Sequence, residues 1–151
     1  MDQKINQIRE MELIEKELRE AKVGVLAFSD GKQNVRQIVT PFVYFDKNLF
    51  FNNTTDENFQ LTIFDDTVNF SVYRELKLPN KEQADFAPSF KYIQIKCSGL
   101  LKKIEEQKVV DEVIKTFRSK YKTGNKEDKQ QVEKLLFIDT EEIQASEIIG
   151  G

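Results

Sequence analysis

The sequence contains no histidine, no tryptophan and a single cysteine, and these absences exclude several kinds of functional site. Without histidine there is no Ser-His-Asp triad, no histidine acid–base catalyst and no histidine-ligated zinc site. The one thiol, Cys97, cannot close an internal disulfide, nor can it supply the thiolates of a zinc ribbon or an iron–sulfur cluster. Chemistry in this protein therefore depends on carboxylates, lysines, tyrosines, Cys97 or a bound cofactor.

The sequence also lacks a long apolar run and an excess of positive charge. No stretch approaches the roughly 20 apolar residues of a membrane-spanning helix, and no apolar signal-peptide segment follows the first residues. The 23 Lys and Arg residues stand against 26 Asp and Glu, which argues against a nucleic-acid partner. We expect a protein that binds neither membranes nor nucleic acid and resides in the reducing cytoplasm, where a lone cysteine stays free.

What remains is the composition of an ordinary globular chain. It has 151 residues, 39% of them hydrophobic, and 12 phenylalanines. A chain of this length usually forms one domain, which buries roughly 70% of the surface that the unfolded chain exposes. We therefore expect a single domain over residues 1–151, with a core that needs no disulfide or metal.

Apolar residues at helical spacing predict amphipathic helices over residues 3–21 and 109–121. A threonine–glutamate capping box predicts a short inserted helix over residues 54–64, and another short helix is predicted around residues 132–136. The apolar positions behind the two long helices are Ile5, Ile8, Met11, Ile14, Leu18 and Ala21 in the first, and Val110, Val113, Ile114, Phe117 and Tyr121 in the second.

Between the helices, period-two alternation and turn signals predict strands. One is expected to bend at Gly99, and Pro41 is expected at an edge or a bulge. Segment 77–90 reads as irregular, and its Phe86 and Phe90 either cover a ligand or pack on the sheet. The predicted strands cover residues 23–28, 34–45, 49–51, 68–73 and 93–104, with a closing strand around Phe137, Ile138 and Ile143.

Short turns between these strands favour antiparallel pairing. The sequence therefore predicts a mainly β fold with α-helices (α+β), in which the sheet curls into a barrel. Ile93, Ile95 and Cys97 alternate with polar residues, so we expect them to face the barrel interior and Cys97 to be a small core residue.

Four local sequences follow one another along the chain. They are Val23-Gly24-Val25-Leu26-Ala27, Arg36-Gln37-Ile38-Val39-Thr40, Phe50-Phe51-Asn52-Asn53 and Gln94-Ile95-Lys96-Cys97-Ser98-Gly99. Their order resembles that in the FMN-binding split β-barrels of the pyridoxamine 5'-phosphate oxidase-like family. The resemblance covers roughly residues 10–121 and implies an antiparallel split barrel with an N-terminal helix, a small inserted helix and C-terminal helices.

The resemblance implies a homodimer that binds FMN, and a small-molecule substrate, in clefts at the subunit interface. By position, Arg36 would meet the flavin phosphate, and Gln94 would contact the polar edge of the ring. Each of these polar residues also has a plainer interpretation, as a solvated charge, a strand end or an outward-facing amide. The cofactor-binding residues implied by the resemblance are Arg36, Ile38, Val39, Thr40, Asn52, Asn53, Thr54, Asn58 and Gln94.

The segment expected to hold the phosphate departs from the family pattern. Members of the family usually carry Ser-Arg-Lys at the start of the inserted helix, whereas this chain has Asp56-Glu57-Asn58. A unit-charge pair at 4 Å is worth about 4 kcal/mol at an effective dielectric of 20, so exchanging cations for carboxylates opposes phosphate binding. Alternatively, Glu57 closes the capping box with Thr54 and the helix caps itself.

Other cations remain as candidate phosphate ligands, and they are Lys32, Arg36, Arg74, Lys91 and Lys96. The acidic tail lacks the basic, aromatic ending of true pyridoxamine phosphate oxidases, so vitamin B6 oxidation is not expected.

Three functions stay open. The first is an FMN-dependent oxidoreductase of unknown substrate, with no catalytic residue assigned. The second is a non-enzymatic or altered-ligand split barrel that has lost the FMN phosphate site. The third is an interaction domain that uses the exposed faces of its two terminal helices.

Overall fold

The computed structural model describes residues 3–29, 34–52, 66–77, 89–122 and 135–150. Within these ranges, antiparallel strands form one eight-stranded sheet, accompanied by two helices. The elements, in chain order, are β1 (Lys4–Ile8), α1 (Met11–Glu20), β2 (Gly24–Ser29), β3 (Val35–Thr40), β4 (Val43–Phe45), β5 (Asn48–Asn52), β6 (Thr67–Glu75), β7 (Phe90–Lys103), α2 (Gln107–Tyr121) and β8 (Leu135–Gly150).

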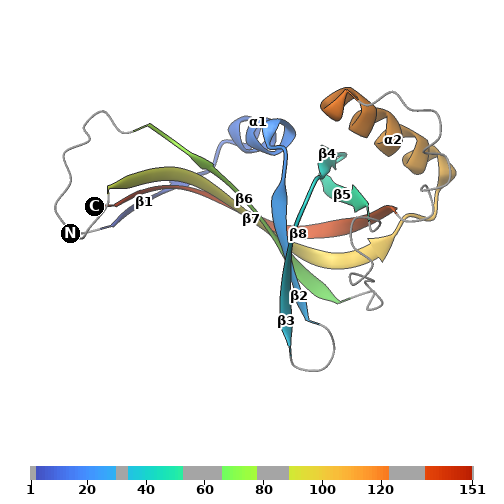
Figure 1. Cartoon of the computed structure of the whole chain (residues 1–151), viewed down its shortest axis with the longest axis horizontal. Helices are drawn as coiled ribbons and strands as arrows, with labels where there is room; N and C mark the ends of the chain where they lie inside the picture. Colours follow the sequence, from blue (N-terminus) through green and yellow to red (C-terminus); the bar gives the residue numbers. More distant parts are fainter. Residues whose placement is uncertain (1–2, 30–33, 53–65, 78–88, 123–134, 151) are drawn as a thin grey trace.

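The strands follow the order β3-β2-β6-β7-β8-β5-β4, and β1 adds to β8. Figure 1 shows β6, β7 and β8 as one long curved band, with the two chain ends together at one tip. At the other end the sheet curls, and β4 and β5 lie under α2. This arrangement is an α+β split barrel, as the sequence predicted.

Alternating side chains fill the interior of the curled sheet. On β6, Val68, Phe70 and Val72 are buried while their neighbours are more exposed, which confirms the predicted half-buried strand. The Phe42 and Phe70 rings pack edge to face, with centroids 4.8 Å apart. Helix α1 closes this core with Ile14 and Leu18, the two residues of its apolar stripe that are fully buried.

A second, smaller core holds α2 against the outside of the curled end. Val110 and Val113 pack there with Val43 of β4, Phe50 of β5 and Leu135 of β8. The predicted helix over residues 109–121 is thus confirmed, and it begins two residues earlier, at Gln107.

The predicted bend at Gly99 is a β-bulge. The β7–β8 register shifts between Ser98 and Gly99, because Ser98 pairs with Glu142 whereas Gly99 pairs with Thr140. Glu141 is therefore the extra residue on β8. A Cβ added at Gly99 would collide with the Asp139 carbonyl group, so the close approach of the two backbones requires glycine.

The prediction of one helix over residues 3–21 is wrong in its first half. Residues Lys4–Ile8 form β1, which pairs with Ile149–Ala145 of β8. The isoleucines at 5 and 8 fit a helical stripe, but pairing with the exposed edge of β8 satisfies their backbone groups instead. Only Met11–Glu20 is helical.

Two further predictions needed correction. The strand predicted over residues 34–45 is two strands, because Pro41 has no N–H for a ladder and the chain leaves the sheet between Thr40 and Val43. Leu135 and Leu136, predicted in a short helix, belong to β8, where they pair with Asn52 and Phe51.

Strands β7 and β8 also extend beyond their predicted bounds, to Phe90 and Gly150 respectively, with the Phe90 ring against Gly150. Phe90 therefore packs on the sheet. The predicted inserted helix over residues 54–64 and Phe86 of segment 77–90 lie outside the described residues.

Replacing Gly99 with alanine should destabilise the fold, because the new methyl group would meet backbone atoms that cannot rotate away. We expect the free energy of unfolding in urea to fall by about 1–3 kcal/mol. Ser98→Ala, at the adjacent half-buried position, is the control and should change it far less. Equal stability of the two variants would contradict the close backbone approach.

Candidate functional site

One face of the sheet, directed away from the barrel interior, carries two of the predicted site residues, Val39 and Gln94. The pairing registers and the alternation along each strand define it, and we call it the outer sheet face. Its residues are Val35, Gln37 and Val39 of β3, Val25 and Ala27 of β2, Asn69, Ser71 and Tyr73 of β6, Gln94 and Lys96 of β7, and Gln144 and Ser146 of β8.

Large apolar side chains on this face are unusually exposed. Val35 is 75% exposed, Val39 66% and Tyr73 70%. Between them lie the small side chains of Ala27 and Ser71, so this part of the sheet is partly apolar. We therefore take this surface as a candidate site for another molecule.

The predicted residues of β3 divide between the two faces of the strand. Val39 lies on the outer sheet face, whereas Arg36, Ile38 and Thr40 have the opposite parity. Thr40 is buried and Ile38 half-buried, so that side is the barrel interior. Arg36 is exposed and pairs with Phe28 of β2. It precedes Thr40 by four residues, so about 13 Å of strand separates Arg36 from Thr40.

Gln94 points outward, as expected, and stands beside Tyr73 of β6 and Ser146 of β8. Asn52 ends β5, two residues beyond Phe50, whose partner is Val43. That position brings Asn52 toward the start of β4 and therefore toward Thr40, which precedes it in the chain. Asn53, Thr54 and Asn58, like Asp56 and Glu57, lie outside the described residues.

The cations considered for a phosphate have different surroundings. Arg74 forms two short hydrogen bonds to the Glu17 carboxylate of α1, at 2.6 and 2.9 Å, and so anchors that helix. Lys91 lies 3.6 Å from Glu147. Lys96 is exposed on the outer sheet face, in the row that runs from Val39 across Val25 and Ser71. Lys32 lies outside the described residues.

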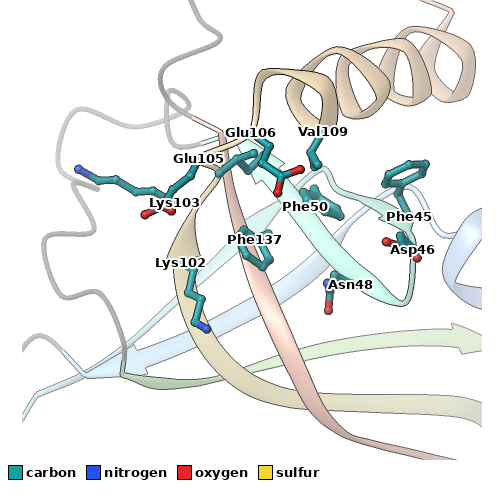
Figure 2. A pocket seen from close by; sticks show the side chains of 11 residues that line it. Phe45, Asp46, Asn48, Phe50, Lys102, Lys103, Glu105, Glu106, Val109 and Phe137 are labelled. Carbon is teal, nitrogen blue, oxygen red and sulfur yellow. The ribbon is translucent and has the colours of Figure 1, made fainter.

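A pocket of about 730 Å³ opens beneath the first turn of α2. Figure 2 shows the rings of Phe45, Phe50 and Phe137 as its apolar part, and those of Phe50 and Phe137 stack with centroids 5.5 Å apart. Its charged residues include both signs, and Lys102 is paired with Asp139 at 2.9 Å. The lining residues are Phe45, Asp46, Asn48, Phe50, Lys102, Lys103, Ile104, Glu105, Glu106, Val109 and Phe137. It contains none of the predicted site residues.

A second pocket, of about 680 Å³, lies between the end of α1, strand β4 and the last turns of α2, and we call it the lysine pocket. Four cations and two carboxylates line it. Its residues are Arg19, Glu20, Lys22, Val43, Tyr44, Glu112, Lys115, Thr116, Ser119 and Lys120.

Tyr121 holds the wall of the lysine pocket together. Its hydroxyl oxygen lies 2.7 Å from the Lys22 carbonyl oxygen and 2.9 Å from that of Phe42, so its single proton is shared between two acceptors. The same oxygen accepts a hydrogen bond from the Phe42 N–H at 3.0 Å. One side chain of α2 thus ties the helix to the chain on both sides of the β2–β3 hairpin.

The Lys120 ammonium group enters the same wall. It donates to the Phe42 carbonyl at 2.8 Å and stands 4.1 Å from the centroid of the Phe42 ring, a cation–π contact. Burial, and then the charge of nearby Lys22, lower the pKa of Lys120 to about 8.

Sequence analysis missed both pockets. Lys22, Phe42 and Lys120 are far apart in the chain, so no local motif joins them. Lys115 and Lys120 both lie on the predicted second helix, but their spacing alone does not indicate a pocket.

Cys97 is buried in the main core, as predicted, and burial raises the pKa of its thiol to about 12. The thiolate is therefore absent at neutral pH, and Cys97 is not a nucleophile. In the ranges that the structure describes, no cluster of acidic or cysteine side chains is arranged to hold a metal ion. Neither described helix has the length and apolar character to span a membrane.

The lowered pKa of Lys120 predicts a pH dependence of stability. Between the folded value of about 8 and the ordinary value of 10.5, the unfolded chain binds more protons at this amine, so the free energy of unfolding rises with pH. In urea titrations from about pH 7 to about pH 9.5, wild type should therefore gain stability relative to Lys120→Met. A stability difference that does not change with pH would contradict the burial of this ammonium.

No protein-family model matches the chain, and no curated protein sequence matches it significantly. Several solved structures, in contrast, share its fold. A candidate 5-nitroimidazole antibiotic resistance protein from Bacteroides thetaiotaomicron is 13% identical, with a TM-score of 0.77 over 99% of this chain and 91% of its own.

Two further structures agree. A FAD-binding protein from Mycobacterium smegmatis is 8% identical, with a TM-score of 0.64 over 94% of this chain and 98% of its own. A candidate pyridoxamine 5'-phosphate oxidase from Corynebacterium glutamicum is 16% identical, with a TM-score of 0.60 over 100% of this chain and 98% of its own. The chain therefore has the split-barrel fold of flavin-binding and pyridoxamine 5'-phosphate oxidase-like proteins.

Proposed function

We propose that this protein is a homodimeric flavin-binding oxidoreductase that holds FMN at its outer sheet face. The observation that carries the proposal is the exposure of Val35, Val39 and Tyr73 on that face. Several solved structures with this fold are named as flavin-binding proteins, which supports the choice of ligand.

The described residues fit the ring half of a flavin. Val39 and its small neighbours provide an apolar surface on which a planar ring can lie, and Gln94 supplies an amide that can reach a polar ring edge. Asn52, at the end of β5, is the proposed contact of the ribityl chain. A bound flavin would supply hydride or electron transfer, whereas the protein positions it and limits access of water.

Fewer of the described residues could bind the phosphate of the flavin. Arg36 lies on the opposite side of β3 from Val39, so the two contact the same flavin only if it wraps around the strand. Lys96, on the same face as Val39, is the alternative cation.

A second copy of the chain is the partner proposed for this face. Burying one valine side chain contributes roughly 1.5–3 kcal/mol, and Val35 and Val39 together leave a substantial part of that unused in the monomer. A two-fold contact would bring each outer sheet face against its equivalent and enclose two flavin sites.

The acidic segment Asp56-Glu57-Asn58 favours a second candidate, a split barrel of the same shape whose ligand carries no phosphate.

For the oxidoreductase, the substrate class is proposed from one structural neighbour, the candidate 5-nitroimidazole resistance protein, so nitroimidazoles are the first electron acceptors to assay.

A titration of FMN fluorescence tests the first candidate. Wild type should bind FMN at micromolar concentration, and Val39→Asp should weaken binding at least tenfold because it places a charge under the ring. Leu13→Asp, at an exposed apolar position on α1, is the control and should bind like wild type. A colourless protein that binds no FMN at high micromolar concentration would sink the flavoprotein.

Charge reversal separates the two candidates. If Asp56 and Glu57 occupy the phosphate segment, Asp56→Arg combined with Glu57→Lys should strengthen FMN binding at least tenfold, since a unit-charge pair is worth more than the roughly 1.4 kcal/mol of one decade. Glu12→Lys on α1 is the control. Unchanged affinity would mean that these carboxylates do not face a phosphate.

Light scattering after size-exclusion chromatography tests the dimer. Wild type should elute as a dimer at micromolar concentration, and Val35→Asp with Val39→Asp should give a monomer that keeps the far-UV circular dichroism of wild type, because both side chains are already exposed in one subunit. Leu13→Asp should remain dimeric. A monomeric wild type would refute the interface.

A further inference from the structure

The lysine pocket, whose lining shares no residue with the outer sheet face, contains two lysine side chains that are both held by backbone carbonyl groups. Lys22 Nζ donates to the Lys120 carbonyl at 3.0 Å, and Lys120 Nζ donates to the Phe42 carbonyl at 2.8 Å. Each amine is thereby held by a backbone acceptor. Burial, and then the positive charge of Lys22, lower the pKa of Lys120.

Neither ammonium group forms a salt bridge within the described residues. In residues 3–29, 34–52, 66–77, 89–122 and 135–150, no carboxylate lies within 4.0 Å of Lys22 or Lys120. An ammonium has three N–H donors, and the backbone carbonyls take one from each lysine. Donors therefore remain on both amines for a ligand.

The rest of the pocket reinforces this positive character. Arg19 and Lys115 add two cations, while Glu20 and Glu112 subtract two, so the lining carries a net charge of +2 (four cations less two carboxylates). The whole chain has a net charge of −3. A positive pocket in an acidic protein selects for a small anion.

Capping of α2 explains only part of this arrangement. Lys22 does satisfy a carbonyl in the last turn of the helix, a favourable place for a cation. Lys120, however, donates its hydrogen bond away from its own helix, to the carbonyl of Phe42, the residue that precedes β4. Its ammonium group also lies partly buried over the Phe42 ring. A cap for α2 requires neither that burial nor a second ammonium beside it.

We propose that the lysine pocket is a binding site for a small dianion of the phosphate-monoester class, with Lys120 and Lys22 as its direct ligands. The pocket volume of about 680 Å³ admits a phosphate together with a small organic group. A charge of −2 on the ligand matches the net charge of the lining. The phosphate belongs either to a free metabolite or to the flavin itself.

The test is a titration of flavin-free protein with inorganic phosphate at constant ionic strength, in which NMR records the chemical shifts of the backbone amides. Amides of Val43, Ser119 and Lys120 should shift together and saturate, and chloride at the same ionic strength should not reproduce the shifts. Lys120→Met and Lys22→Met should each weaken phosphate binding at least tenfold, whereas Lys120→Arg should retain most of it.

Lys108→Met, an exposed lysine at the other end of α2, is the matched control and should bind phosphate like wild type. If phosphate shifts no pocket amide, or if Lys120→Met binds it as tightly as Lys108→Met does, the site does not exist. Both results are independent of flavin binding, which is measured separately by fluorescence.

Competition then identifies the source of the phosphate. FMN that displaces inorganic phosphate from the pocket amides, while riboflavin does not, would assign the pocket to the phosphate of the flavin. Phosphate that binds alongside FMN would assign it to a separate phosphate monoester. Either result supports the site and names its occupant.

Discussion

The antiparallel pairing of β7 with β8 is the constraint on which the rest of the molecule depends. It runs from Phe90 paired with Gly150 to Lys103 paired with Leu136. Strand β6 attaches to one side of this ladder, and β5 and β1 attach to the other. Because α2 lies between the two strands in sequence, closing the ladder also places the helix over β4 and β5, and with it both pockets. These contacts join distant parts of the chain, and such contacts form slowly during folding.

The parts of the fold that sequence could predict are those in which burial follows a local period. Val68, Phe70 and Val72 on β6 and the stripe of α2 have such a period, and the structure buries the three β6 residues together with Val110 and Val113 of α2. Strand β1 could not be predicted, because its two isoleucines fit a helix and only the free edge of β8 makes them a strand. The strand at Leu135 and Leu136 could not be predicted for the same reason, because the partners of these residues lie on β5.

The candidate site shows the same division. The resemblance to a known family directed attention to β3 and Gln94, and the structure places Val39 and Gln94 on one face while Arg36 lies on the other. Which side of a strand a residue faces follows from pairing, and a short similarity in sequence does not carry that information. The lysine pocket depends on even less local information, because Lys22, Phe42 and Lys120 meet only after the barrel has closed.

The single extra residue at Glu141 has a consequence for how this protein can change. Before the bulge, the even-numbered residues Leu136 and Ile138 are buried in the main core; after it, the odd-numbered Ala145 is. On β8, odd-numbered residues therefore face outward before the bulge, as Phe137 does beneath α2. Even-numbered residues face outward after it, as Ser146 does on the outer sheet face. Insertions or deletions in β8 that preserve both surfaces must come in pairs, whereas loss of one residue would exchange interior for exterior along half of the longest strand.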